Sequence, residues 1–178
     1  MVMFEKVSRF KDADIKMPMR STAKSAGYDL PVAEDIIIPP FSGQLKEMMR
    51  FIPNYESACF TLDQMKEFVK DSGIKPTLVS TGLKCYLDDD KYLELSPRSS
   101  TPLKYWLVMA NSEGIIDADY ADNPDNEGEI FLQMINLSPF DIQLKAGDCI
   151  GQGIIKTYCV TDDDIAQGNR LGGFGSTS

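Results

Sequence analysis

"FDIQLKAGDCIGQGIIKTYCV", residues 140–160, carries the pattern that decides the fold. Two runs rich in apolar and β-branched residues flank "KAGD" at residues 145–148, where Gly and Asp are typical of a tight turn. The segment therefore predicts two strands joined by a short turn.

The same pattern extends over much of the chain. Short apolar runs lie between Gly, Pro, Asp and Ser in "DIIIPP" from Asp35, "TLVSTGLKCYL" from Thr77, "KYLELSPR" from Lys91 and "EIFLQMINLS" from Glu129. "NPDNEG" at residues 123–128 is expected to form a longer hairpin loop. Strands of this length predict an all-β sandwich or jelly roll, and 178 residues are expected to form one domain over 1–178.

One segment, residues 44–75, interrupts the strand pattern and is interpreted as an insertion. Within it "TLDQMKEFVKDSG" predicts one amphipathic helix, with Thr61 as its cap and Gly73 near its end. The apolar face of this helix could pack on the flank of its own subunit or could dock another protein.

Charge and composition limit the possible functions. The net charge of −9 argues against broad binding to nucleic acid or to an anionic membrane. The chain has no histidine, which excludes Ser-His-Asp and Cys-His catalysis and leaves carboxylates and hard cations as the expected chemistry. A polyanionic ligand would need a local basic cluster and a metal ion.

The four cysteines form no CxxC pair, so we expect reduced thiols that lie mostly in the core. No apolar run approaches the length of a membrane span. These features predict a cytoplasmic protein.

Five stretches hold residues suited to chemistry: "AGYDL" (26–30), "PRSS" (97–100), "NSEGIIDADY" (111–120), "AGDCIGQGI" (146–154) and "RLGGFGSTS" (170–178). Each alone could be ordinary structure, such as a strand-ending turn, a hairpin strand or a flexible tail. Together they offer the Arg98 guanidinium next to the hydroxyls of Ser99 and Ser100. They also offer the carboxylate of Asp117, which follows two apolar residues, and the aromatic ring of Phe174 within a glycine-rich tail. This combination fits a nucleoside triphosphate.

In this order, the five stretches resemble the motifs of the trimeric deoxyuridine triphosphate nucleotidohydrolases (dUTPases), and "NPDNEG" is similar to Gram-positive bacterial and phage members. The resemblance covers the chain except for the insertion. It implies a jelly-roll-like distorted barrel with one inserted helical segment, assembled as a homotrimer whose sites are shared between subunits.

The resemblance also implies a role for each matched residue. Asp117 would position the attacking water, Tyr120 would pack under the deoxyribose, and Asp29 would lie near Mg²⁺, through water. The tail over 168–178 would be a flexible lid. Other substrate-binding positions are implied at Arg98, Ser99, Ser100, Asn111, Gly114, Ile115, Ile116, Phe131, Gln152, Arg170, Phe174, Gly175 and Ser176.

The implied reaction is Mg²⁺-assisted attack of water on the α-phosphorus of dUTP, giving dUMP and pyrophosphate. This would limit uracil incorporation into DNA and supply dUMP for dTMP synthesis. Two alternatives stay open: a deoxycytidine triphosphate deaminase, which shares the fold, and a regulatory module whose insertion binds a protein partner. The chain departs from the family pattern in "DYADN", in its last residue Ser178 and in the insertion.

Overall fold

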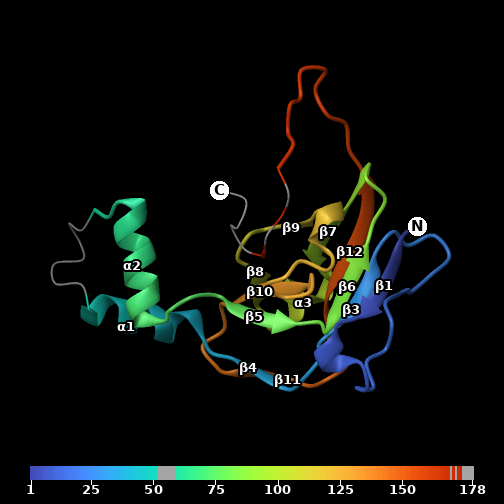
Figure 1. The fold of residues 1–178 in the computed structure, drawn as a ribbon. Helices are drawn as coiled ribbons and strands as arrows, with labels where there is room; N and C mark the ends of the chain where they lie inside the picture. Colours follow the sequence, from blue (N-terminus) through green and yellow to red (C-terminus); the bar gives the residue numbers. More distant parts are fainter. Residues whose placement is uncertain (52–58, 169, 171, 174–178) are drawn as a thin grey trace.

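The computed structural model describes all residues from 1 to 178 except 52–58, 169, 171 and 174–178. Its described part is built mainly from short antiparallel strands, as the sequence predicts (Figure 1). The largest sheet has five strands in the order β2 (Met19–Arg20), β3 (Tyr28–Pro31), β12 (Cys149–Thr157), β7 (Lys91–Pro97) and β9 (Gly114–Ile116).

A second sheet of three strands has the order β5 (Thr77–Ser80), β10 (Phe131–Asn136) and β8 (Leu107–Met109). Two further pairs complete the body: β1 (Met3–Lys6) with β6 (Leu83–Tyr86), and β11 (Ile142–Leu144) with β4 (Ile36–Ile38). Mostly β architecture of the jelly-roll type is therefore confirmed.

The core lies where the five-stranded and three-stranded sheets face each other. Leu93 and Leu95 of β7 and Leu132 of β10 are fully or almost fully buried in one cluster. A Cβ added at Gly151 of β12 would lie only 2.5 Å from Leu132 Cδ1, so this strand can approach β10 closely because it lacks a side chain there.

The quoted segment folds as its pattern predicts. β11 and β12 are joined by the turn at 145–148, in which the Asp148 amide donates to the Lys145 carbonyl at 3.0 Å. Gly147 adopts a φ of 91°, which explains why glycine occupies that position.

The predicted helix is present as α2 (Leu62–Ser72). Thr61 and Gln64 form a reciprocal capping box, and Gly73 ends the helix in the left-handed conformation with φ 68°. A second helix, α1 (Phe41–Phe51), precedes it, so the expectation of one helix in the insertion is wrong and the helical region begins before residue 44.

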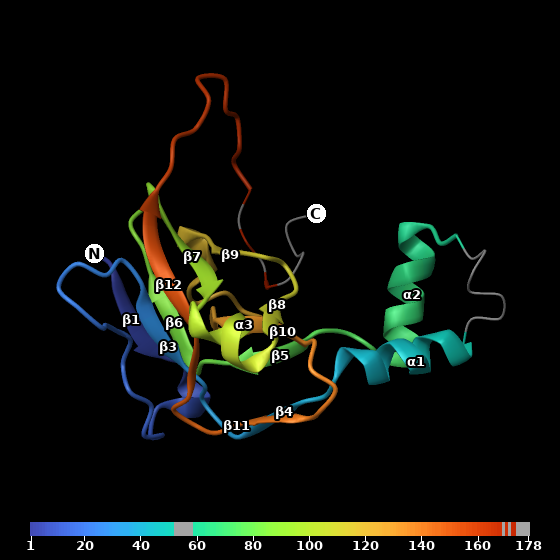
Figure 2. The same ribbon diagram turned by 180° about the vertical axis from the view of Figure 1, so that it is seen from behind.

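Both views place α1 and α2 to one side of the β body (Figures 1 and 2). On α2, Met65, Phe68 and Val69 are half-buried, whereas Leu62 is 82% exposed. In both views the helix pair stands beside the β body and does not lie along its flank.

Shorter helical segments in the described part of the chain include α3 (Ser100–Tyr105) and the 3₁₀ turns η1 (Ser8–Phe10) and η3 (Ala118–Tyr120). The sequence pattern does not predict a helix after "PRSS". α3 forms there because buried Thr101 donates its hydroxyl to the Ile150 carbonyl at 2.6 Å, which ties the helix to β12.

All four cysteines are free, but Cys59 and Cys159 are exposed, so the expectation that they lie mostly in the core is wrong for these two. Within the described ranges, no helix is both long and apolar enough to cross a membrane.

Candidate active site

A pocket of about 190 Å³ opens beside β9. β9 with the turns on either side of it, β10, and the C-terminal segment supply its walls. Its lining residues, which define what we call the hairpin pocket, are Asn111, Ile115, Ile116, Tyr120, Phe131, Gln133, Arg170 and Gly173.

β9 sets the position of the carboxylate at the edge of this pocket. Gly114 lies opposite Leu95 of β7, and a Cβ there would come within 3.0 Å of the Leu95 side chain, so the close pairing requires glycine. Asp117 follows the strand in an extended conformation and directly precedes η3. The amide of Tyr120 then donates to the Asp117 carbonyl at 3.1 Å, which turns the chain and brings the tyrosine into the pocket wall.

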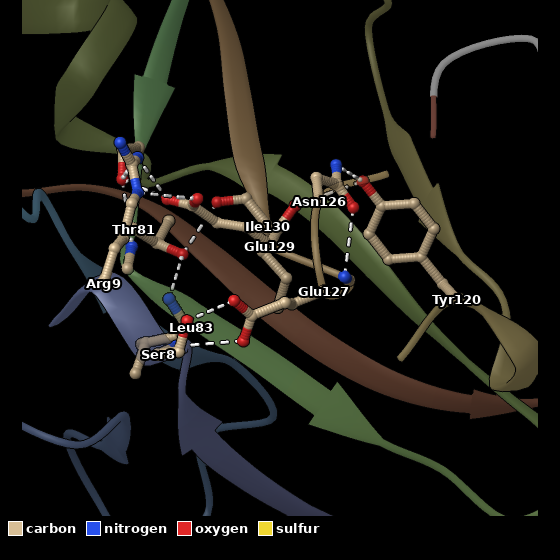
Figure 3. A network of polar contacts seen from close by, with 12 residues as sticks. Ser8, Arg9, Thr81, Leu83, Tyr120, Asn126, Glu127, Glu129 and Ile130 are labelled. Atoms are coloured by element: carbon tan, nitrogen blue, oxygen red, sulfur yellow. Dashed lines mark hydrogen bonds and ion pairs between the residues drawn. The ribbon is translucent and has the colours of Figure 1, made fainter. Parts of the chain in front are cut away.

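The phenol of Tyr120 is held from both sides. It donates to the Glu129 carbonyl at 3.1 Å and accepts from Asn126 Nδ2 at 2.9 Å (Figure 3). Burial raises the pKa of Tyr120, although the Asn126 hydrogen bond and the Arg170 charge oppose that effect. The ring is therefore a neutral and fixed wall at neutral pH.

The loop after η3 is a hydrogen-bonded scaffold for that tyrosine. Asn123 accepts from the amides of Asp125 and Asn126 at 3.1 Å, as expected for the turn predicted from "NPDNEG". At the far end of the loop, buried Glu129 pairs with Arg9 at 2.8 Å (Figure 3). Residues of the N-terminal segment thus anchor the loop that orients Tyr120.

Arg170 is the cation of the hairpin pocket. Its Nη2 pairs with Asp117, its Nε donates to Asp119 at 2.8 Å, and its guanidinium carbon lies 5.6 Å from the centre of the Tyr120 ring. Burial tends to lower the pKa of Arg170, but the Asp119 hydrogen bond and both carboxylate charges raise it above its usual value. The arginine stays charged and neutralises Asp117 in this conformation.

A second group of polar residues lies where β7, β12 and β3 run side by side, and we call it the arginine cluster. Arg98 Nε pairs with Asp29 Oδ1 at 3.1 Å, and the Arg98 amide donates to the Ile150 carbonyl at 3.0 Å. Gln152 of β12 is in register with Asp29 of β3 and donates from Nε2 to the Pro97 carbonyl at 3.3 Å. The cluster consists of Asp29, Arg98, Ser99, Ser100 and Gln152.

The strand register separates the cluster from the hairpin pocket. β9 pairs with β7 so that Ile116, which precedes Asp117, lies opposite Leu93. Arg98 is five positions further along the chain, which corresponds to about 16 Å of strand. Arg98 lines a different pocket, of about 340 Å³, together with Tyr105 and Asp148.

The chain is similar to known proteins over nearly its whole length. A sequence model of the dUTPase family matches residues 52–178. The deoxyuridine 5′-triphosphate nucleotidohydrolase of Lactococcus lactis is 37% identical over 176 residues, covering 98% of this chain and 95% of the relative. This chain belongs to the dUTPase family.

Solved structures agree with that assignment. The crystal structure of dUTPase from Streptococcus mutans shares 34% identity with a TM-score of 0.67, covering 89% of this chain and 98% of that one. The dUTPase from phage phi11 of S. aureus, whose species-specific insert has been visualised, shares 15% identity with a TM-score of 0.62 over 94% of this chain and 97% of that one. At this identity the phage structure supports the fold alone.

The dUTPase residues predicted from the sequence fall into two groups in the structure. Asn111, Ile115, Ile116, Tyr120, Phe131 and Arg170 line the hairpin pocket, with Gly114 behind it and Asp117 at its edge. Arg98, Ser99, Ser100, Gln152 and Asp29 lie in the arginine cluster. Phe174, Gly175 and Ser176 lie outside the described residues, and the lid expected over 168–178 is described only in part.

Sequence reasoning missed three residues of the site: Gln133, Gly173 and Asp119. Gln133 could have been found, because it is two positions from Phe131 on a strand and therefore shares its face. Asp119 could not, because its partner Arg170 is 51 positions away in the sequence.

The metal-ligating capacity of this dUTPase chain is small. Among the described residues, no three His, Cys, Asp or Glu side chains are grouped so that they could hold a metal ion. Asp29 accepts hydrogen bonds from Arg98 and, at 3.0 Å, from the Ser21 hydroxyl. Such a donor set suits Mg²⁺ that is held mainly by substrate phosphates and water, with one carboxylate nearby.

Proposed function

We propose that this protein hydrolyses dUTP to dUMP and pyrophosphate. The observation that carries the proposal is the hairpin pocket itself, in which an exposed carboxylate, Asp117, stands at the edge of a pocket walled by a fixed tyrosine. Membership of the dUTPase family and the name of the Lactococcus relative support the same reaction.

The pocket is proposed to hold the nucleoside. Asn111 and the backbone of Gly114, Ile115 and Ile116 would face uracil, with Phe131 on the opposite strand. Their polar atoms would be left unpaired by cytosine, and the narrow pocket would exclude a 5-methyl group. Tyr120, whose hydroxyl is held by Glu129 and Asn126, would pack under deoxyribose and would leave no room for a 2′-hydroxyl.

Asp117 is proposed to orient and deprotonate the water that attacks the α-phosphorus. In the conformation described, the carboxylate is bound to Arg170, so the substrate must draw Arg170 away before Asp117 can act. The phosphates of dUTP are the natural competitor, because guanidinium binds phosphate oxygens in the same fork geometry.

The phosphates are proposed to lie against the arginine cluster. Arg98, the hydroxyls of Ser99 and Ser100, and Gln152 supply donors, and the tail would add Phe174 over uracil and Gly175 and Ser176 at the phosphates. Mg²⁺, when bound to the triphosphate with Asp29 nearby, would offset its charge and favour departure of pyrophosphate. An acidic chain needs that compensation.

Assembly into a homotrimer is proposed to complete the site. Ile116, which precedes Asp117, is separated from Arg98 of the same chain by about 16 Å of strand, and Asp117 lies beyond Ile116 on the side away from Arg98. Arg98 borders a different pocket from the hairpin pocket. Reaction geometry requires the attacking water within about 3.5 Å of phosphorus, so the water and the phosphate donors must converge. A neighbouring subunit that contributes its arginine cluster to this hairpin pocket would meet that need.

A protein partner for the insertion and a cytoplasmic location stay predictions from the sequence. Leu62 of α2 is 82% exposed, and α1 and α2 contribute no described residue to the hairpin pocket or the arginine cluster. A partner could therefore bind these helices without blocking either group.

The direct test is pyrophosphate release from dUTP, dCTP, dTTP and UTP, with and without Mg²⁺. We expect release from dUTP alone, dependent on Mg²⁺ and lost in Asp117→Asn. Binding of dUTP without turnover would support a sensor, and consumption of dCTP would support the deaminase alternative. Either result would overturn the proposed function.

A further inference from the structure

We propose that Arg9 is a positioning residue for Tyr120, which it holds through Glu129, and that this contact strengthens the preference of the site for deoxyribose over ribose. The preference rests on the proposed function, whereas the positioning is a property of the chain without substrate. Arg9 lies in η1, 120 positions before Glu129, and is not among the residues that line the hairpin pocket.

Glu129 places a carboxylate in the interior of the chain. Its side chain is only 5% exposed, and Arg9 donates to both carboxylate oxygens, from Nη2 at 2.8 Å and from Nε at 3.1 Å (Figure 3). The Ser80 hydroxyl also donates to this carboxylate and accepts from Arg9 Nη2 at 3.1 Å. Because a buried carboxylate is strongly destabilising once its cation is removed, Arg9 holds Glu129 in this position.

The main chain of Glu129 connects this ion pair to the pocket wall. Its carbonyl accepts a hydrogen bond from the Tyr120 phenol at 3.1 Å, and its amide donates to the Asn126 carbonyl at 3.0 Å. Asn126 in turn donates from Nδ2 to the Tyr120 hydroxyl at 2.9 Å. Both of these hydrogen bonds to the phenol therefore depend on where Glu129 lies.

Contacts without Arg9 anchor the next residue, Ile130. Its amide donates to the Leu83 carbonyl at 2.8 Å, and its carbonyl accepts from Thr81 Oγ1 at 2.8 Å (Figure 3). Loss of Arg9 should therefore leave β10 in place and loosen the residues before Ile130. We expect a change in how firmly Tyr120 is held, with the overall fold preserved.

The position of the Tyr120 ring is what would exclude a 2′-hydroxyl. A ring that can shift makes room for one more oxygen atom, whereas deoxyribose fits whether or not the ring shifts. A looser Tyr120 should therefore raise kcat/KM for UTP more than it lowers kcat/KM for dUTP. The ratio of the two values is the quantity that reports the positioning.

The test compares kcat/KM for dUTP and UTP in Arg9→Met, which removes the charge and the guanidinium fork. We expect the preference for dUTP to fall by about fivefold, which corresponds to the loss of about one hydrogen bond at the ring. Arg9→Lys keeps the charge without the fork and should give a smaller fall. Arg50→Met, at an exposed pair with Glu47 at 3.1 Å in α1, is the matched control and should not change the preference.

Rescue by a second substitution separates positioning from a general loss of stability. Glu129→Gln removes the buried charge that needs Arg9, so the double variant Arg9→Met with Glu129→Gln should recover the preference to within about twofold of the unaltered protein. An unchanged preference in Arg9→Met would overturn the inference. A double variant that accepts UTP as readily as Arg9→Met alone would overturn it too.

Hydrogen exchange tests the positioning without substrate. The amides of residues 118–129, which include those of Tyr120 and Glu129, should exchange faster in Arg9→Met, return toward the original rate in the double variant and stay unchanged in Arg50→Met. Equal exchange in Arg9→Met and the unaltered protein would contradict the inference. If the unaltered protein does not hydrolyse dUTP, the proposed function fails while the exchange result still decides whether Arg9 positions Tyr120.

Discussion

The hairpin pocket and the arginine cluster differ in how much of a site one chain supplies. The pocket gathers residues from β9, η3, β10 and the C-terminal segment of one chain, and its carboxylate already has a cation, Arg170. In the cluster, Arg98 is paired with Asp29, and its nearest pocket contains neither Asp117 nor Tyr120.

This difference shows that the two groups of residues are positioned by different parts of the fold. Antiparallel pairing fixes Ile116 beside Leu93, and no change of side-chain rotamer alters that register. In the proposed assembly, the nucleoside pocket would be formed within one subunit, and the phosphate site would take the arginine cluster of another. The variants below test each half of this comparison.

The largest effect is expected at the pocket edge. Asp117→Asn keeps the size of the side chain but removes the base, so kcat for dUTP should fall by about a thousandfold. Steady-state pyrophosphate release measures it, with the thermal midpoint of unfolding as a control for folding. Activity within threefold of the unaltered protein would exclude Asp117 as the group that activates water.

A somewhat smaller loss is expected in the arginine cluster. Arg98→Ala removes a phosphate fork and leaves Asp29 without its cation, so kcat/KM should fall by about a hundredfold. Arg98→Lys is the matched variant, which keeps the charge but not the fork, and its loss should be intermediate. Full activity in Arg98→Lys would show that bidentate recognition is unnecessary.

The smallest effect is expected in the scaffold of the pocket. Asn126→Ala removes the hydrogen bond to the Tyr120 hydroxyl, which is worth about 1 kcal/mol, so the preference for dUTP over UTP should weaken by about fivefold. The ratio of kcat/KM for the two nucleotides measures this effect. Ser8→Ala removes the hydroxyl that donates to Glu127 in the same network, and as the control it should leave the ratio unchanged (Figure 3).

Local signals were enough for much of the fold. The turn at 145–148 and the cap at Thr61 depend on residues close in sequence, and both formed as predicted. α1 was not predicted, although Phe41, Leu45, Met48 and Met49 have helical spacing. It directly follows the prolines at 39 and 40.

The candidate site was predicted in its residues but not in its arrangement. The motifs identified Asp117 and Arg98, yet only strand register shows that they lie at different ends of β7. The contacts of Arg170 with Asp117 and Asp119 join segments more than fifty positions apart, and such pairing depends on how the whole chain folds.

The most direct test of the central claim is to co-express Asp117→Asn and Arg98→Ala chains in equal amounts and measure dUTP hydrolysis. If each site takes Asp117 from one chain and Arg98 from another, random assembly makes about one quarter of the sites fully intact, and about one quarter of the activity should return. Activity no higher than the mean of the two separate variants would contradict a site shared between subunits.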